Sequence, residues 1–186
     1  MIRPAQKSDV DAVVPLIVSA LAPGSFQLTD SGDESEAYPV VSAFFLQEVN
    51  RHSYRNTMVY EVDGVVAAAV VCYDGAHEAA LAQPILTFIR NYYEDETLPP
   101  HYETQPGELY IDTLAVDPAF RKRGIARLLL DAVCAQARSM GLPCVGLLVE
   151  DVNVGAKALY ANYGFLVTGF KNLWGHQYEH MQYVLD

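Results

Sequence analysis

The pattern of apolar and polar positions predicts a strand–helix–strand unit over residues 108–149. Residues 109–116 are rich in apolar side chains, and the Asp-Pro pair that follows ends this strand because proline lacks a ladder donor. From Gly124 to Met140 the apolar residues recur at helical spacing. Residues 145–149 are apolar throughout, as expected for a strand covered on both faces. The two strands should therefore be parallel, with a right-handed crossover.

Three further segments have readable patterns. Met58–Val62 and Val65–Tyr73 are apolar runs joined by Asp-Gly, which predicts a hairpin with a tight turn. Residues 153–163 suit a short helix closed by Gly164, with another strand after it. Apolar positions over residues 40–49 suit a helix, whereas residues 24–39 are typical of an irregular, acidic loop.

The turn between the first predicted strand and the long helix has the features of an anion site. Arg121, Lys122 and Arg123 come directly before the helix, whose first N–H groups and positive dipole end point to the same place. Gly124 and Ala126 allow a ligand to approach the backbone closely. The turn therefore predicts a ligand that carries pyrophosphate. The sequence has neither GxxxxGK[ST] nor GxGxxG, so it supports neither a nucleoside-triphosphate loop nor a dinucleotide fold.

Composition is that of one globular domain over residues 1–186, with 51% hydrophobic and 19% charged residues. No apolar run is long enough to span a membrane, and the first residues do not resemble a signal peptide. Cys72, Cys134 and Cys144 form no disulfide framework, which favours the reducing cytoplasm. No group of His, Cys and Asp has the spacing of metal ligands, so no metal is expected.

Charge is distributed unevenly along the chain, whose formal net charge is −11. Residues 1–110 carry 5 Lys or Arg against 16 Asp or Glu, whereas residues 111–186 carry 7 of each. Such an acidic field repels nucleic acid and attracts cationic amines, although acidic surfaces also serve solubility alone.

Two motifs follow one another along the chain: R-x-x-G-x-A at residues 121–126 and the more specific N-x-x-A-x-x-L-Y-x-x-x-G-F at residues 153–165. Together they resemble the GNAT superfamily of acyl-CoA-dependent N-acetyltransferases. The two chain ends also resemble that family, and residues 20–107 resemble it little. The resemblance implies an α/β fold. Its central sheet is mixed, mostly antiparallel and twisted, with about six or seven strands flanked by helices and a splayed parallel pair at the cofactor site.

The resemblance also implies acetyl-CoA as the acyl donor. Its pantetheine arm is expected on the backbone of one strand, at Leu114, Ala115 and Val116. Its pyrophosphate is expected on the amides and cations of the turn, at Arg121, Arg123, Gly124, Ile125 and Ala126, with Lys122 directed to solvent. Asn153 matches the residue that steadies pantetheine, and it is equally suited to cap the short helix.

Residue roles follow the same comparison. Tyr160 matches the tyrosine that protonates the departing thiolate as general acid, and a backbone N–H near Val116 is the expected oxyanion donor. Strand alternation places Glu108, Tyr110 and Asp112 on one face. We expect Asp112 or Glu108 to act as general base through water. His176 and His180 are outside candidates for the base. Tyr110 is expected to line the acceptor site, and Trp174 and Tyr178 are expected to supply an aromatic wall.

The resulting hypothesis is acetyl transfer from acetyl-CoA to a primary amine of a small molecule, a protein N-terminus or a lysine. The alternative is a non-catalytic acyl-CoA-binding regulatory module with the same fold. Residues 75–107 contain a predicted helix and a proline-rich loop, and with the 20–50 region they should wall the acceptor pocket. The sequence leaves open the acceptor, the acyl length and whether the chain forms a homodimer, as many members of the superfamily do.

Overall fold

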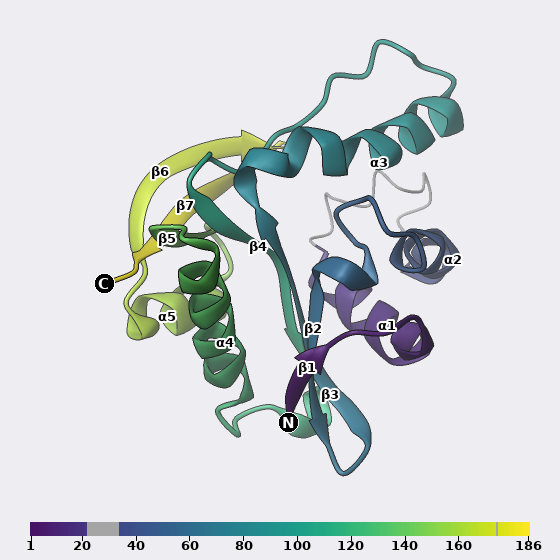
Figure 1. Cartoon of the computed structure of the whole chain (residues 1–186). Helices are drawn as coiled ribbons and strands as arrows, with labels where there is room; N and C mark the ends of the chain where they lie inside the picture. The colour runs from purple at the N-terminus through teal and green to yellow at the C-terminus, as the bar shows by residue number, and fades with distance from the viewer. Residues whose placement is uncertain (22–33, 174) are drawn as a thin grey trace.

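The computed structural model describes residues 1–21, 34–173 and 175–186. Over these residues, one sheet of seven strands has the order β1-β2-β3-β4-β5-β7-β6 (Figure 1). The strands are β1 (Ile2–Pro4), β2 (Thr57–Val62), β3 (Val65–Asp74), β4 (Glu108–Val116), β5 (Cys144–Glu150), β6 (Leu166–Leu173) and β7 (His176–Val184). The helices are α1 (Val10–Ala20), α2 (Glu34–Phe45), α3 (Glu78–Tyr93), α4 (Ile125–Met140) and α5 (Val154–Tyr163).

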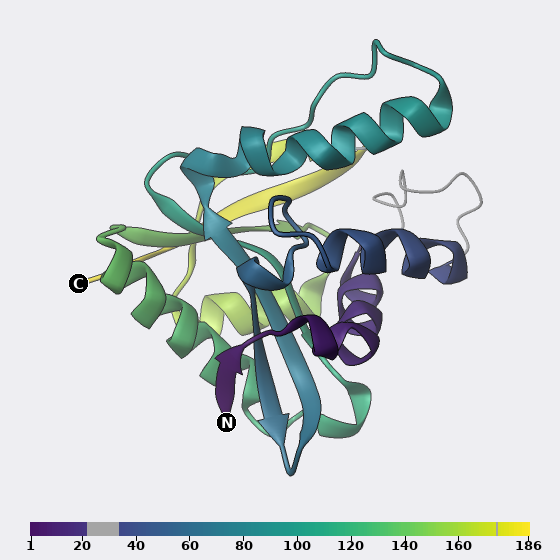
Figure 2. The same ribbon diagram turned by 45° about the vertical axis from the view of Figure 1, so that its right-hand side comes forward.

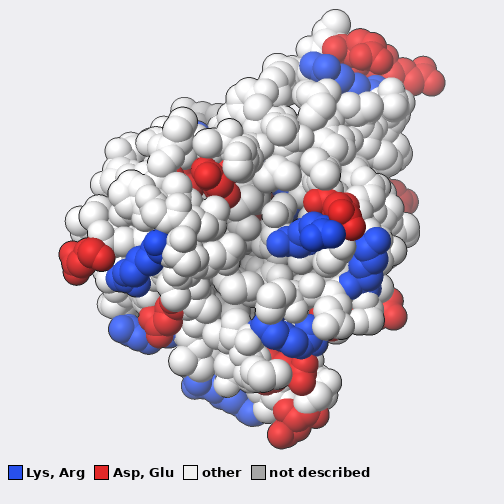
Figure 3. All heavy atoms as spheres, in the orientation of Figure 1, with Lys and Arg blue, Asp and Glu red and all other residues white. Residues whose placement is uncertain are grey.

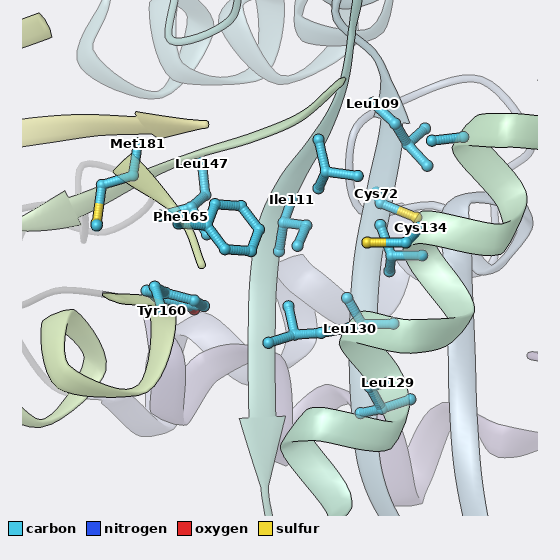
Figure 4. Close-up of a cluster of buried hydrophobic side chains, with 14 of the residues drawn as sticks. Cys72, Leu109, Ile111, Leu129, Leu130, Cys134, Leu147, Tyr160, Phe165 and Met181 are labelled. Atoms are coloured by element: carbon cyan, nitrogen blue, oxygen red, sulfur yellow. The ribbon is translucent and has the colours of Figure 1, made fainter. Parts of the chain in front are cut away.

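The sheet is antiparallel except at its centre, where β4 and β5 are parallel. This mixed sheet with flanking helices confirms the predicted fold class. Helix α4 covers one face through Leu129, Leu130 and Val133, which pack against β3, β4 and β5 (Figure 4). Helices α1 and α2 cover the other face, and α3 lies beside α2, where the rings of Phe44 and Phe88 are in contact (Figure 2). Each face of the sheet therefore has its own hydrophobic cluster.

The elements with the clearest local patterns lie where they were predicted. The β2–β3 hairpin turns at Asp63 and Gly64, both with positive φ, as a tight Asp-Gly turn requires. Helix α4 is bounded by Gly124 and Gly141, both in the left-handed region. Helix α5 begins after Asn153, which caps it. Of the described helices, none is both long and apolar enough to cross a membrane.

The loop prediction for residues 24–39 is wrong over its last part, because α2 begins at Glu34 and contains Pro39. Residues 24–33 of that prediction lie outside the described part of the chain. Proline inside a helix removes one backbone hydrogen bond. The helix forms nevertheless because it buries an apolar face, which includes Val41 and Phe45, against α1.

A β-bulge in β4 changes which side chains face each helix layer. Val71 of β3 pairs with Thr113 and Cys72 pairs with Ile111, so Asp112 is the extra residue of β4. Before the bulge, Leu109 and Ile111 face α4. After the bulge, the side chains of Leu114 and Val116 face α4. The strict alternation used in the sequence analysis therefore holds only as far as Asp112.

The surface charge is mixed on the face shown in Figure 3, where Lys and Arg are interspersed with Asp and Glu. The acidic surplus of the first 110 residues forms no single acidic patch on this face.

Candidate active site

A cleft opens where β4 and β5 part. Within the described chain, their parallel pairing couples residues 108–111 with residues 144–147 and goes no further, although β4 continues to Val116 and β5 to Glu150. The cleft has a volume of about 950 Å³ and is lined by both strands, the start of α4, the end of α1 and α5. This is the splayed parallel pair that the resemblance implies.

The turn before α4 forms one end of the cleft. Gly124 has φ +78°, and a β-carbon there would meet nothing within 4 Å, so its backbone conformation rather than close packing requires glycine. The N–H groups in the first turn of α4 have no carbonyl acceptor within the helix and can therefore bind a ligand. Arg121 donates from Nε to the Val116 carbonyl at 3.0 Å. These features make the turn suitable for an anion.

The cations of this turn differ in position. Among the described residues, the cleft lining includes Arg121, Lys122 and Arg127 but not Arg123. Arg123 donates to the Ala119 carbonyl at 3.1 Å and lies over the Phe120 ring at 5.2 Å. Its side chain therefore supports the turn from outside, whereas Lys122, expected to face solvent, borders the cleft.

Helix α5 brings Asn153 and Tyr160 to the opposite wall of the cleft. The Asn153 side chain accepts the Ala156 N–H at 3.1 Å, so the capping role expected for it is present. Tyr160 is 8% exposed and packs against Phe165 with ring centroids 5.7 Å apart (Figure 4). Burial raises the pKa of Tyr160 to about 12, so this phenol stays protonated at neutral pH.

A buried charge cluster forms the other end of the cleft; it comprises Arg51, Tyr73, Glu103, Tyr110 and Asp112. Arg51 Nη2 lies 2.7 Å from Asp112 Oδ2 and 2.5 Å from Glu103 Oε1. The Tyr73 hydroxyl donates to Asp112 at 3.0 Å, and the Tyr110 hydroxyl donates to Glu103 at 2.7 Å. The cluster therefore sets one guanidinium between two carboxylates, each also bonded by a phenol.

The two carboxylates have pKa values shifted in opposite directions. Burial acts to raise the pKa of Asp112, but the Arg51 charge, His52 and the hydrogen bonds from Arg51 and Tyr73 outweigh it and lower that pKa. For Glu103, burial raises the pKa more than the Arg51 charge lowers it. Burial also lowers the pKa of His52, which keeps that imidazole neutral at pH 7. Glu103 is thus the more basic carboxylate.

Glu108 lies apart from the other predicted catalytic residues. Its oxygens accept from the Gln105 N–H at 2.8 Å and from Gln182 at 2.7 Å, and they lie 3.2 Å from His180. The carboxylate fills the space above Gly146, where any β-carbon would collide with it. Glu108 is fully buried and is not in the cleft lining of the described residues. Glu108 is excluded from the cleft because β4 is still paired with β5 at this position, and β5 and β7 cover the Glu108 side chain.

The remaining predicted residues divide into three groups. Leu114, Ala115, Val116, Gly124, Ile125 and Ala126 all line the cleft, as does Tyr110. His180 is buried in β7, and His176 pairs with Glu150 at 2.6 Å. Trp174 lies outside the described residues. The structure adds Arg51 and Glu103 to the cleft, and the sequence had not indicated either residue. In the sequence Arg51 is an isolated cation and Glu103 lies in an acidic loop, and neither feature points to a site.

Comparison with known proteins identifies the class to which this fold and cleft belong. The sequence model of the acetyltransferase (GNAT) family matches residues 24–165. The chain therefore belongs to this family.

Solved structures agree over the full length. A crystal structure of an acetyltransferase is 31% identical, with a TM-score of 0.73 and 100% coverage of both chains. The N-acetyltransferase from Staphylococcus aureus Mu50 is 26% identical, with a TM-score of 0.81 and coverage of 98% of this chain and 100% of that one.

Curated relatives match over a shorter segment. The mycothiol acetyltransferase of Propionibacterium freudenreichii subsp. shermanii is 39% identical over 61 residues, which is 33% of this chain and 19% of that protein. The match thus spans about a fifth of that relative's length.

Proposed function

We propose that this protein is an N-acetyltransferase that moves an acetyl group from acetyl-CoA to a primary amine by direct attack in a ternary complex. Membership of the acetyltransferase family supports this activity. The observation that carries the proposal is the parting of β4 and β5, which leaves the cleft-facing edge of β4 unpaired between the anion-binding turn and Tyr160. An extended pantetheine arm could add its hydrogen bonds to that edge as a strand does.

The donor would be held mainly by backbone groups. Pyrophosphate would lie on the amides of the turn, with Arg121 and Lys122 beside it, and pantetheine would bond to the backbone of Leu114, Ala115 and Val116. These residues all border one cleft, and such a site needs backbone geometry more than particular side chains. Asn153 would contribute its amide nitrogen, since its oxygen already caps α5.

Transfer requires an oxyanion donor, an acid and a base. We assign the oxyanion donor to a backbone N–H near Val116 and the acid to Tyr160, whose raised pKa keeps a proton available for the departing thiolate. The amine proton would leave toward the buried charge cluster. Of the two carboxylates expected here, Asp112 belongs to this cluster and borders the cleft, whereas Glu108 is enclosed by β7 and is not in position to take part.

Acceptor and setting are proposed only as classes. We propose a small-molecule or peptide amine as acceptor, and relatives named mycothiol acetyltransferase and ribosomal protein bS18-alanine N-acetyltransferase support this choice. We also propose a cytoplasmic setting, which the three free cysteines support. A homodimer would be compatible with this activity.

Two measurements test the proposal. Acetyl-CoA at 100 times its dissociation constant should stabilise the protein by about 2.7 kcal/mol, measured as a rise in melting temperature. Tyr160→Phe should lower amine-dependent thiol release by about 10²-fold or more while this stabilisation is unchanged. Tyr163→Phe is the matched control, because its hydroxyl bonds to Asp131 on α4 rather than bordering the cleft.

The alternative function gives a different result. A regulatory acyl-CoA-binding module would be stabilised by acetyl-CoA but would release no thiol with any amine, and Tyr160→Phe would change nothing measurable. Absence of any stabilisation by acetyl-CoA would contradict both functions.

A further inference from the structure

Two charged side chains hold the backbone of the loop that joins α3 to β4. Glu78, which is 3% exposed, accepts from the Glu103 N–H at 2.7 Å, the Thr104 N–H at 3.0 Å and the Thr104 hydroxyl at 2.8 Å. Lys171 of β6 donates to the Tyr102 carbonyl at 3.1 Å and to the Glu103 carbonyl at 2.7 Å. Burial of the Glu78 carboxylate would be costly without these hydrogen bonds, so the loop backbone that donates them is held in place. Together with the Lys171 contacts, they fix the backbone of Glu103 at one position.

That position is the wall of the cleft. Glu103 is 6% exposed, borders the cleft, and bonds to Arg51 through one oxygen and to Tyr110 through the other. The cluster contains one cation and two carboxylates, and the adjacent His52 is neutral. This end of the cleft thus carries an excess negative charge in a buried setting, which a compact cation would complement.

The order of residues along β4 shows which part of a bound donor would face this charge. From the turn at α4 the cleft follows Val116, Leu114 and Asp112 to Tyr110, beside Glu103. The rise of a strand places Tyr110 about 13 Å beyond Leu114. A donor whose pyrophosphate lies at the turn would therefore direct its acyl end toward the buried charge cluster.

We propose that Glu103 accepts the proton of the acceptor ammonium, and that the acceptor is a compact alkyl amine that arrives as a cation. This proposal rests on the acetyl-transfer function above. Arg51, which is itself bonded to Asp112, positions the Glu103 carboxylate, and Glu78 and Lys171 position its backbone. The same contacts make the α3–β4 loop, rather than β4 itself, the source of the base.

The proton balance is complete with groups already named. The ammonium gives one proton to Glu103, and the amine nitrogen then forms a bond to the thioester carbon. The carbon–sulfur bond breaks, and Tyr160 gives its proton to the thiolate. The second nitrogen proton returns to the Tyr160 phenolate, and Glu103 releases its proton to solvent. The products are the amide, CoA thiol and one proton.

Glu103 suits this step better than Asp112. Asp112 receives bonds from Arg51 and Tyr73, and its lowered pKa makes it a weak proton acceptor. Glu103 has a raised pKa because of its burial. Among the described residues, the titratable groups that face Glu103 are Arg51, Tyr73, Glu78, Tyr110, Asp112, Lys171 and Tyr178. The phenols among them all have raised pKa values, that of Tyr178 being about 12. They therefore stay protonated between pH 7 and 9.5.

The test compares Glu103→Gln with the wild type in thiol release from acetyl-CoA, using spermidine, ethanolamine and a tripeptide with a free α-amino group. At pH 7 the variant should lose about 10²- to 10⁴-fold in kcat/KM. The loss should shrink about tenfold per pH unit as pH rises toward the alkyl ammonium pKa of about 10, because free amine then needs no base. Glu96→Gln, an exposed change in the same loop, is the matched control.

Glu103→Asp keeps the carboxylate and should retain the wild-type shape of the pH profile at a reduced rate, so loss of folding in one variant does not obscure the result. A deficit of less than threefold in Glu103→Gln, or one that is equal at pH 7 and pH 9.5, would overturn the assignment. Stabilisation by acetyl-CoA without wild-type turnover of any of the three amines would overturn the cationic acceptor. Lack of that stabilisation would instead remove the proposed function.

Discussion

The two ends of the cleft are built in different ways. The end at α4 is made of consecutive residues in a turn, its side chains are exposed, and its binding groups are backbone amides. The other end is made of Arg51, Glu103 and Asp112, which come from three separate segments and are buried together. The first end suits an anion such as pyrophosphate. The second is built from charged side chains that distant segments bring together, so we expect it to contact the acceptor.

Removal of the central cation should have the largest effect on stability. Arg51→Met would leave two carboxylates buried without their partner, which costs about 3–5 kcal/mol when a buried pair is broken. Urea unfolding of wild type and variant measures this loss.

Arg121→Met is the matched change at the other end of the cleft. Arg121 is exposed, so the free energy of unfolding should change by no more than about 0.5 kcal/mol. Equal losses in the two variants would contradict the distinction between a buried and an exposed end.

The same distinction explains what the sequence could predict. The β4–turn–α4 unit, the hairpin at Asp63-Gly64 and helix α5 each depend on local signals: proline after a strand, glycine at positive φ, and a capping asparagine. The residues expected to hold the donor lie in or beside these elements, and all of them except Arg123 line the cleft of the described chain.

The buried charge cluster depends on contacts between distant segments. Arg51 and Asp112 are 61 residues apart, and nothing near either in sequence indicates that they meet. Alternation placed Glu108 and Asp112 on one face but could not show that β7 covers the first and leaves the second at the cleft. The start of α2 was predicted wrongly for the same reason. Pro39 favours a loop, and only the packing of α2 against α1, which the local sequence does not indicate, explains the helix.

A glycine comparison would test whether the α4 end binds through its backbone. Gly124 and Gly141 bound the same helix, with φ of +78° and +72°, and a β-carbon at either would meet nothing within 4 Å. Alanine at either position should therefore lower the free energy of unfolding by about 1–2 kcal/mol, because an L-residue is strained in the left-handed conformation. Thermal unfolding measures both.

Only the change at Gly124 should affect the donor, because Gly124 borders the cleft and Gly141 is at the far end of α4. Gly124→Ala should weaken acetyl-CoA binding by about tenfold, or 1.4 kcal/mol, in a calorimetric titration. A comparable loss of affinity in Gly141→Ala would mean that the effect arises from helix strain and not from the binding site.

The smallest effect expected is a pair of opposite pH dependences within the buried charge cluster. The pKa of Asp112 is lowered in the folded protein, so its carboxylate adds stability above an unfolded pKa near 3.8, and this is lost as pH falls through the folded value. The pKa of Glu103 is raised, so its protonation adds stability as pH falls through the folded value toward 4.5.

Substitution of each carboxylate by its amide, which does not titrate, separates the pH dependence of Asp112 from that of Glu103. The stability advantage of wild type over Asp112→Asn should decrease below pH 4, whereas that of wild type relative to Glu103→Gln should increase as pH falls toward 4.5. Each unit of pKa difference corresponds to about 1.4 kcal/mol. Urea unfolding between pH 7 and 3 measures both slopes. Two slopes of the same sign would mean that the carboxylates share Arg51 equally, and Glu103 would then have no advantage over Asp112 as the proton acceptor.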